Sequence, residues 1–149
     1  MLDEKADTSN VAARFVGALL CIQVAIIHII DQGGIPGSKT PSYVGVGYWI
    51  LEILGIVTAI ALIANRAVRL SWFIAIGVGV GPMIGYILSR GPGLPGYTDD
   101  VGNWGEPIGL FSLTAEAILI VLAVTFFLRN LRQPVPAPAH RMATSASVS

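Results

Sequence analysis

Four long apolar stretches constrain the fold of this 149-residue chain more than any other feature of its sequence. As α-helices, stretches of about 20 residues cross a hydrocarbon core of about 30 Å. A backbone inside a bilayer has to satisfy its own hydrogen bonds, which favours helices over irregular structure. The expected spans are residues 11–31, 43–64, 70–89 and 107–128. The sequence therefore predicts an all-α, four-helix transmembrane bundle.

The composition agrees with a membrane protein and excludes several other classes. Only 12% of the residues are charged, roughly half the usual share in soluble proteins. The formal net charge is zero, so no basic surface is expected to bind nucleic acid. Cys21 is the only cysteine, which rules out an internal disulfide and a thiolate zinc site.

The distribution of lysine and arginine predicts the orientation, because cytoplasmic flanks retain positive charge. Seven of the nine basic residues fall on the side of the two termini and the link at 65–69, and two fall on the side of the loops at 32–42 and 90–106. We therefore expect a multi-pass plasma (inner) membrane protein with both termini in the cytoplasm. The seven are Lys5, Arg14, Arg66, Arg69, Arg129, Arg132 and Arg141, and the two are Lys39 and Arg90.

The domain organisation follows from these spans. Residues 1–10 are expected to form a cytoplasmic N-terminal segment, since their acidic character does not fit a secretory signal. Residues 11–131 form the transmembrane domain. Residues 132–149 are rich in proline, alanine and serine, which predicts a disordered cytoplasmic tail.

Two matching features suggest an internal duplication. The motif Gly34-Ile35-Pro36-Gly37 follows the first span, and Gly93-Leu94-Pro95-Gly96 follows the third. A glutamate lies inside each subsequent span, at Glu52 and Glu116. The chain is thus predicted to consist of two tandem helical hairpins in parallel orientation, related by an axis along the membrane normal.

The two glutamates are the strongest functional candidates in the sequence. Each lies nine residues into its span, which places it near the middle of the membrane. Acids at this depth are rare and often belong to a pathway, a proton relay or a ligand site. Gln23 falls at a similar depth and is a candidate hydrogen-bond partner. The alternative is that two neutral carboxylic acids only hold helices together.

A second candidate site lies nearer the outer boundary. His28 and Asp31 are three residues apart and therefore share one helix face. Imidazole and carboxylate together suit a transition metal ion, which Asp99 and Asp100 of the second outer loop would help to bind. The alternative is a histidine–carboxylate pair that anchors the helix end, since no second nitrogen or sulfur ligand accompanies His28.

The third span carries glycines at four-residue spacing, Gly77, Gly81 and Gly85, a pattern typical of closely packed membrane helices. We expect this face to pack against another helix. Pro82 is expected to interrupt the hydrogen bonding of the same helix, and an interrupted helix can line a binding site.

The segments HIIDQGGIPGSKTPSYVG and LSRGPGLPGYTDDVGNWGEP resemble those of small four-helix bacterial membrane proteins to which no activity is attached. The number of helices is similar to that of DoxX-like proteins, some of which are linked to quinone chemistry. The chain contains no diagnostic motif of that class, so the resemblance implies the fold alone.

Three functions are compatible with the sequence. The first is a protein whose outward-opening polar interior binds or transports a proton, a metal ion or a small polar ligand. The second is a non-catalytic accessory subunit of a larger membrane complex. The third, a quinone-linked redox enzyme, has the least support, because no nucleophile with an adjacent base and no pair of haem-ligating histidines is found. The expected partners are the lipid bilayer and a second copy or a larger complex.

Overall fold

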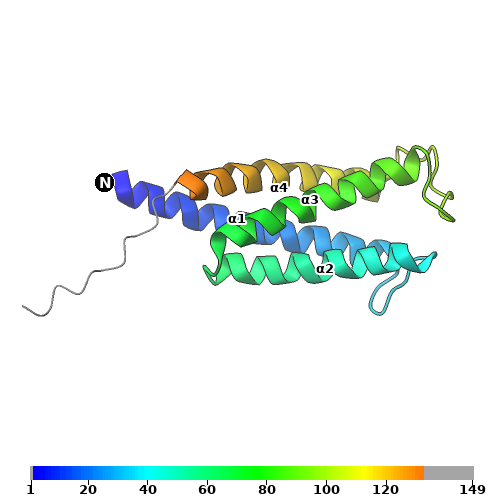
Figure 1. Cartoon of the computed structure of the whole chain (residues 1–149), viewed down its shortest axis with the longest axis horizontal. Helices are drawn as coiled ribbons and strands as arrows, with labels where there is room; N and C mark the ends of the chain where they lie inside the picture. Colours follow the sequence, from blue (N-terminus) through cyan, green and yellow to red (C-terminus); the bar gives the residue numbers. More distant parts are fainter. Residues whose placement is uncertain (1, 133–149) are drawn as a thin grey trace, which may run out of the picture.

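The computed structural model describes residues 2–132, which form four α-helices packed as a bundle (Figure 1). Each helix is long and apolar enough to cross a membrane. The predicted disordered tail lies outside the described residues from position 133 onward. The helices are α1 (Leu2–Asp31), α2 (Ser42–Ile63), α3 (Val68–Arg90) and α4 (Pro107–Arg132).

The all-α prediction is confirmed, and the observed bounds lie close to the predicted spans. Helix α1 differs most, because it begins at Leu2 although its apolar span begins only at Asn10. Helix α4 begins at Pro107, where the missing N–H of proline costs no helical hydrogen bond. Between α2 and α3 the chain turns within a few residues, with Asn65 and Ala67 at positive φ.

The four helices form two hairpins. Helices α1 and α2 pack most extensively on each other, and so do α3 and α4; contacts of α1 with α4 and of α2 with α3 close the bundle. The loops at 32–41 and 91–106 lie together at one end, here called the loop end (Figure 1). The start of α1, the link at 64–67 and the last turn of α4 lie at the opposite end, here called the terminal end.

A buried aromatic pair anchors the core toward the terminal end. Trp72 is fully buried and stacks on Phe126 with ring centroids 5.4 Å apart. Gly17 of α1 makes room for this indole, because a Cβ there would lie 2.7 Å from the ring. Leu62 and Leu119 belong to the same buried cluster. Helices α2 and α3 meet at this end and diverge toward the loop end (Figure 1).

The glycines of α3 do not form the predicted packing face. A Cβ added to Gly77, Gly81 or Gly85 would meet nothing within 4 Å. The closely packed glycine is Gly79, where a Cβ would lie 2.7 Å from Ile120 and 3.0 Å from the backbone oxygen of Glu116. The prediction of a packing face at the three glycines is therefore wrong for contacts within this chain. Helix α3 presents a different side to α4, and its glycine row faces open space.

This difference between glycines is testable by substitution with alanine. Gly79→Ala should lower the free energy of unfolding by about 1–3 kcal/mol, because the added methyl group overpacks the contact with α4. Gly81→Ala has open space around it and should be neutral or stabilising by up to about 1 kcal/mol through helix propensity. Denaturant titration of both variants in the same detergent measures the effect. Equal losses at the two positions would contradict the packing described here.

Candidate functional site

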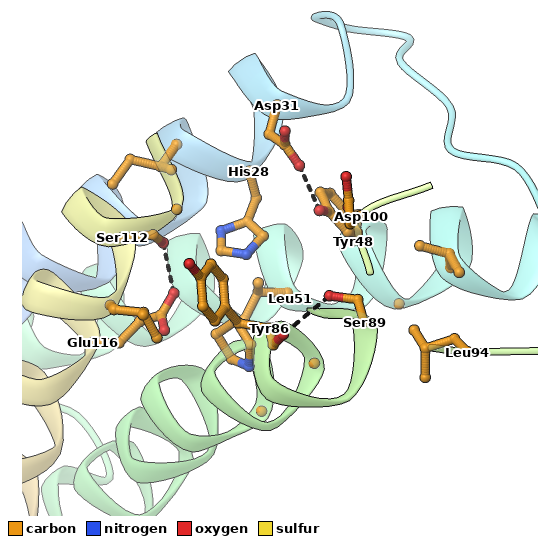
Figure 2. A pocket seen from close by; sticks show the side chains of 18 of the residues that line it. His28, Asp31, Tyr48, Leu51, Tyr86, Ser89, Leu94, Asp100, Ser112 and Glu116 are labelled. Carbon is orange, nitrogen blue, oxygen red and sulfur yellow. Dashed lines mark hydrogen bonds between the residues drawn. The ribbon is translucent and has the colours of Figure 1, made fainter. Parts of the chain in front are cut away.

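The divergence of α2 and α3 leaves a cavity of about 410 Å³ in the loop half of the bundle (Figure 2). All four helices and the loop at 91–106 line it. Its walls are mainly apolar, and four glycines leave space where side chains would otherwise fill the gap. These glycines are Gly47 on α2 and Gly77, Gly81 and Gly85 on α3.

Glu116 of α4 lines this cavity and is only 1% exposed. Ser112, one helical turn earlier, donates its hydroxyl to Oε1 at 2.6 Å. The other carboxyl oxygen, Oε2, is buried and has no hydrogen-bond partner among the described residues. Leaving a buried polar atom unpaired costs about 1–3 kcal/mol, so such atoms call for an explanation. A ligand or water in the cavity would supply the missing partner.

Glu52 has a different environment from Glu116. It is buried on the face of α2 that packs on α1, together with Gly45, Gly55 and Ala59, as the helical spacing indicates. Glu52 is absent from the cavity lining. Its Oε1 accepts a hydrogen bond of 2.6 Å from Nε2 of Gln32. The pair therefore joins α1 to α2 and does not face the cavity.

The partner of Glu52 is thus Gln32 and not Gln23, the candidate named from the sequence. Gln32 lies just past the end of α1 and is 5% exposed, whereas Gln23 lies deeper in the helix and is half-buried. Gln32 was expected to lie in the loop at 32–42 and was not predicted as a partner of Glu52. The signal that identifies it is its position four residues after His28, which puts it on the same buried face.

His28 is brought into the cavity, whose wall it shares with Glu116 (Figure 2). Its Nδ1 lies 2.8 Å from the backbone oxygen of Val24. A carbonyl oxygen only accepts, so Nδ1 carries the proton, and Nε2 of the neutral ring is an acceptor. The ring meets the edge of Tyr48 with centroids 5.1 Å apart. His28 is therefore oriented by its own helix and by α2.

Asp31 is held by the first loop. Its carboxylate lies 3.1 Å from Nζ of Lys39 and accepts a hydrogen bond from the hydroxyl of Tyr48. Asp31 and His28 both line the cavity, but Asp31 is tied to these two partners near the loop end. The arrangement corresponds to a helix end fastened by an ion pair.

The second loop is fastened over the cavity by Arg90, the last residue of α3. Its guanidinium pairs with Glu106 and with Asp100, the latter at 3.5 Å. The hydroxyl of Tyr97 donates a hydrogen bond to Asp100 at 2.7 Å. The pKa of Tyr97 is raised above its usual value, mainly by burial and in addition by this hydrogen bond. The hydroxyl of Tyr43 donates to the backbone oxygen of Pro95 at 2.8 Å, which links α2 to the same loop.

The predicted metal ligands are only partly brought together. Asp100 lines the cavity with His28 and Asp31, but Asp99 is exposed on the loop. Within residues 2–132, no group of three or more His, Cys, Asp and Glu side chains is placed to hold a metal ion. A metal site at these residues stays a prediction from the sequence.

Removing the charge of Arg90 should loosen the second loop. Arg90→Gln leaves the carboxylates of Asp100 and Glu106 without their cationic partner, so we expect several-fold faster cleavage of the bond before the exposed Asp99 by an aspartate-specific endoprotease. The matched control is Arg66→Gln, which removes one charge from the exposed link at the other end. Cleavage at the same rate in wild type and Arg90→Gln would show that the ion pairs do not hold the loop.

Comparison with known proteins assigns no family to this chain. No family model, no curated protein and no solved structure matches it. The helices themselves indicate a polytopic membrane protein whose outer surfaces contact lipid. Any functional conclusion therefore rests on the cavity and on the groups that face it.

Proposed function

We propose that this protein is a membrane-embedded binding protein that holds a small molecule in the cavity, with Glu116 as the group that recognises it. The observation that carries the proposal is the unpaired, buried Oε2 of Glu116 in the wall of a cavity. An unpaired carboxyl oxygen in such a position is costly, and the cost is compensated when a ligand bonds to it.

The size and chemistry of the cavity support a small molecule over a bare ion. Its volume of about 410 Å³ falls within the range of roughly 300–1,000 Å³ that is usual for ligand pockets. Such pockets combine apolar walls with a few convergent polar groups. Here these groups include Glu116 with Ser112 and, from α1, His28. The ligand is therefore expected to carry an apolar body and a hydrogen-bonding group.

The glycines of α3 favour binding over a purely accessory role. An accessory subunit would need a face able to pack on a partner, and the glycine row of α3 is the candidate for it. Gly77, Gly81 and Gly85 instead line the cavity, and a side chain at any of them would occupy open space. The glycine row is then needed to keep the cavity open.

The proposal includes the orientation and the repeat inferred from the sequence. With both termini cytoplasmic, the cavity lies in the outer half of the plasma membrane, and the loop end faces outward. Two tandem hairpin repeats are supported by the matching loops and by a buried glutamate nine residues into the second span of each hairpin. In the first hairpin Glu52 is hydrogen-bonded to Gln32, whereas in the second hairpin Glu116 faces the cavity.

The test is photolabelling of the purified protein in liposomes with 1-azidoanthracene, an apolar aromatic probe. Mass spectrometry should locate adducts on cavity residues such as Leu51 and Tyr86, and 1-aminoanthracene should suppress them by competition. Adducts on the lipid-exposed Ile84 and Val121 serve as the internal control. These residues lie outside the cavity, so 1-aminoanthracene bound there should not reduce their labelling. Equal behaviour of both groups of adducts would mean that the cavity binds nothing, and the proposal would fall.

A further inference from the structure

The cavity has a side opening between α2 and α3. Gly47, Gly77 and Gly81 line the cavity and are also exposed at the surface. Their neighbours in the lining, Ile50 and Leu54, are 53% and 40% exposed. All five residues lie inside candidate membrane spans. The medium outside this opening is therefore the hydrocarbon of the bilayer and not water.

Glu116 and two polar residues that line the cavity with it lie opposite this opening. Glu116 and Ser112 belong to α4 and His28 belongs to α1, whereas the opening lies between α2 and α3. In the part of the chain that the structure describes, the backbones of α2 and α4 make no contact, so the cavity extends between these two helices. A molecule that reaches Glu116 from the opening would have its polar group at the back and its apolar part toward the lipid.

The loop end offers a less direct route. Tyr43 is bonded to Pro95 and Tyr86 to Trp104, so α2 and α3 are both tied to the second loop. Arg90 fastens the same loop through its two acidic partners. These contacts cover the cavity on the side where a water-soluble ligand would enter.

From these three observations we infer that the ligand is a membrane-dissolved amphiphile, which enters sideways between α2 and α3 and bonds to Glu116 through its head group. The inference rests on the proposed binding function and adds the ligand class and the route. The glycine row on α3 forms a smooth wall along which an apolar chain can lie, since no side chain protrudes from it. An apolar chain left in the opening stays in contact with lipid and costs no exposure to water.

The route is tested with a nitroxide label attached to the cysteine of Gly81→Cys, in a Cys21→Ala background and in liposomes. The measured quantity is the rate at which the label collides with dissolved paramagnetic reagents. Oxygen, which concentrates in lipid, should reach this label as often as a label at Ile84→Cys on the lipid face. A water-soluble nickel complex should reach it several-fold less often than a label at Asn103→Cys in the exposed loop. Nickel collisions at Gly81 equal to those at Asn103 would overturn lateral entry. Low collision rates with both reagents would also overturn it, because a second copy or another protein would then cover the opening.

The ligand class is tested by competition against the 1-azidoanthracene label with two alcohols that share a hydroxyl head. Decanol, which dissolves in the bilayer, should reduce labelling of Leu51 and Tyr86 several-fold, and glycerol should not. If glycerol competes and decanol does not, binding in the cavity stands but the amphiphile inference fails. If 1-aminoanthracene itself gives no protection, the proposed function fails instead.

Discussion

Gly85→Phe is expected to weaken ligand binding in the cavity by at least about tenfold while the protein remains folded. Gly85 lines the cavity, is half-buried and has nothing within 4 Å of the position of an added Cβ. The benzyl group therefore has room to enter the cavity without displacing the backbone. It would occupy the space that a ligand needs and prevent the ligand's apolar contacts with the cavity wall. A loss of about 1.4 kcal/mol of binding free energy already weakens binding tenfold.

The measurement is the concentration of 1-aminoanthracene that halves the labelling of Leu51. We expect this concentration to rise by at least about tenfold in Gly85→Phe. The control is Ile84→Phe, the same substitution one residue earlier, at a position 51% exposed and outside the cavity lining. Unchanged competition in Gly85→Phe would show that the labelled site is not the cavity.

The two glutamates should respond in opposite ways to the same substitution. Glu116→Leu removes the unpaired oxygen, and the hydroxyl of Ser112 can then bond to the helix backbone. Stability should be unchanged or higher by about 1–3 kcal/mol, while binding of 1-aminoanthracene should weaken about tenfold through the lost hydrogen bond. Glu52→Leu leaves the buried amide of Gln32 without its partner, so it should lower stability by about 1–3 kcal/mol and leave binding intact.

This crossed pattern separates a ligand group from a structural one. Denaturant titration gives the stability of each variant, and photolabel competition gives its affinity. Circular dichroism of both variants checks that the helices are retained. Loss of stability in Glu116→Leu without loss of binding would mean that Glu116 is a helix-packing group, which was the alternative considered from the sequence.

The helices were predictable because the bilayer is a simple constraint. A span has to be apolar over its whole length. Its boundaries lie where turn residues or charges occur, as at Pro107, where α4 begins, and at Arg90, where α3 ends. The start of α1 was not predictable in this way. Most residues from Leu2 to Ser9 are polar, and a helix can continue out of the apolar region without any signal in the hydropathy.

The candidate site was predicted less completely, because its geometry depends on how the helices rotate and diverge. Equal depth suggested that Glu52 and Glu116 share one polar interior, but each helix turns its glutamate toward a different neighbour. The glycine spacing on α3 is the same whether the row contacts a helix or borders a cavity, so the sequence could not distinguish the two. The choice of Gln32 over Gln23 depends on the register of α1 and α2, which hydropathy does not encode.

The central claim, that a ligand bonds to Glu116, is tested most directly by infrared difference spectroscopy. A film of reconstituted protein would be perfused with 1-aminoanthracene, and the carboxyl bands compared between wild type, Glu52→Gln and Glu116→Gln. The account predicts a carboxyl band shift in wild type and Glu52→Gln that is missing in Glu116→Gln. A shift that persists in Glu116→Gln, or no carboxyl shift in wild type, would contradict it.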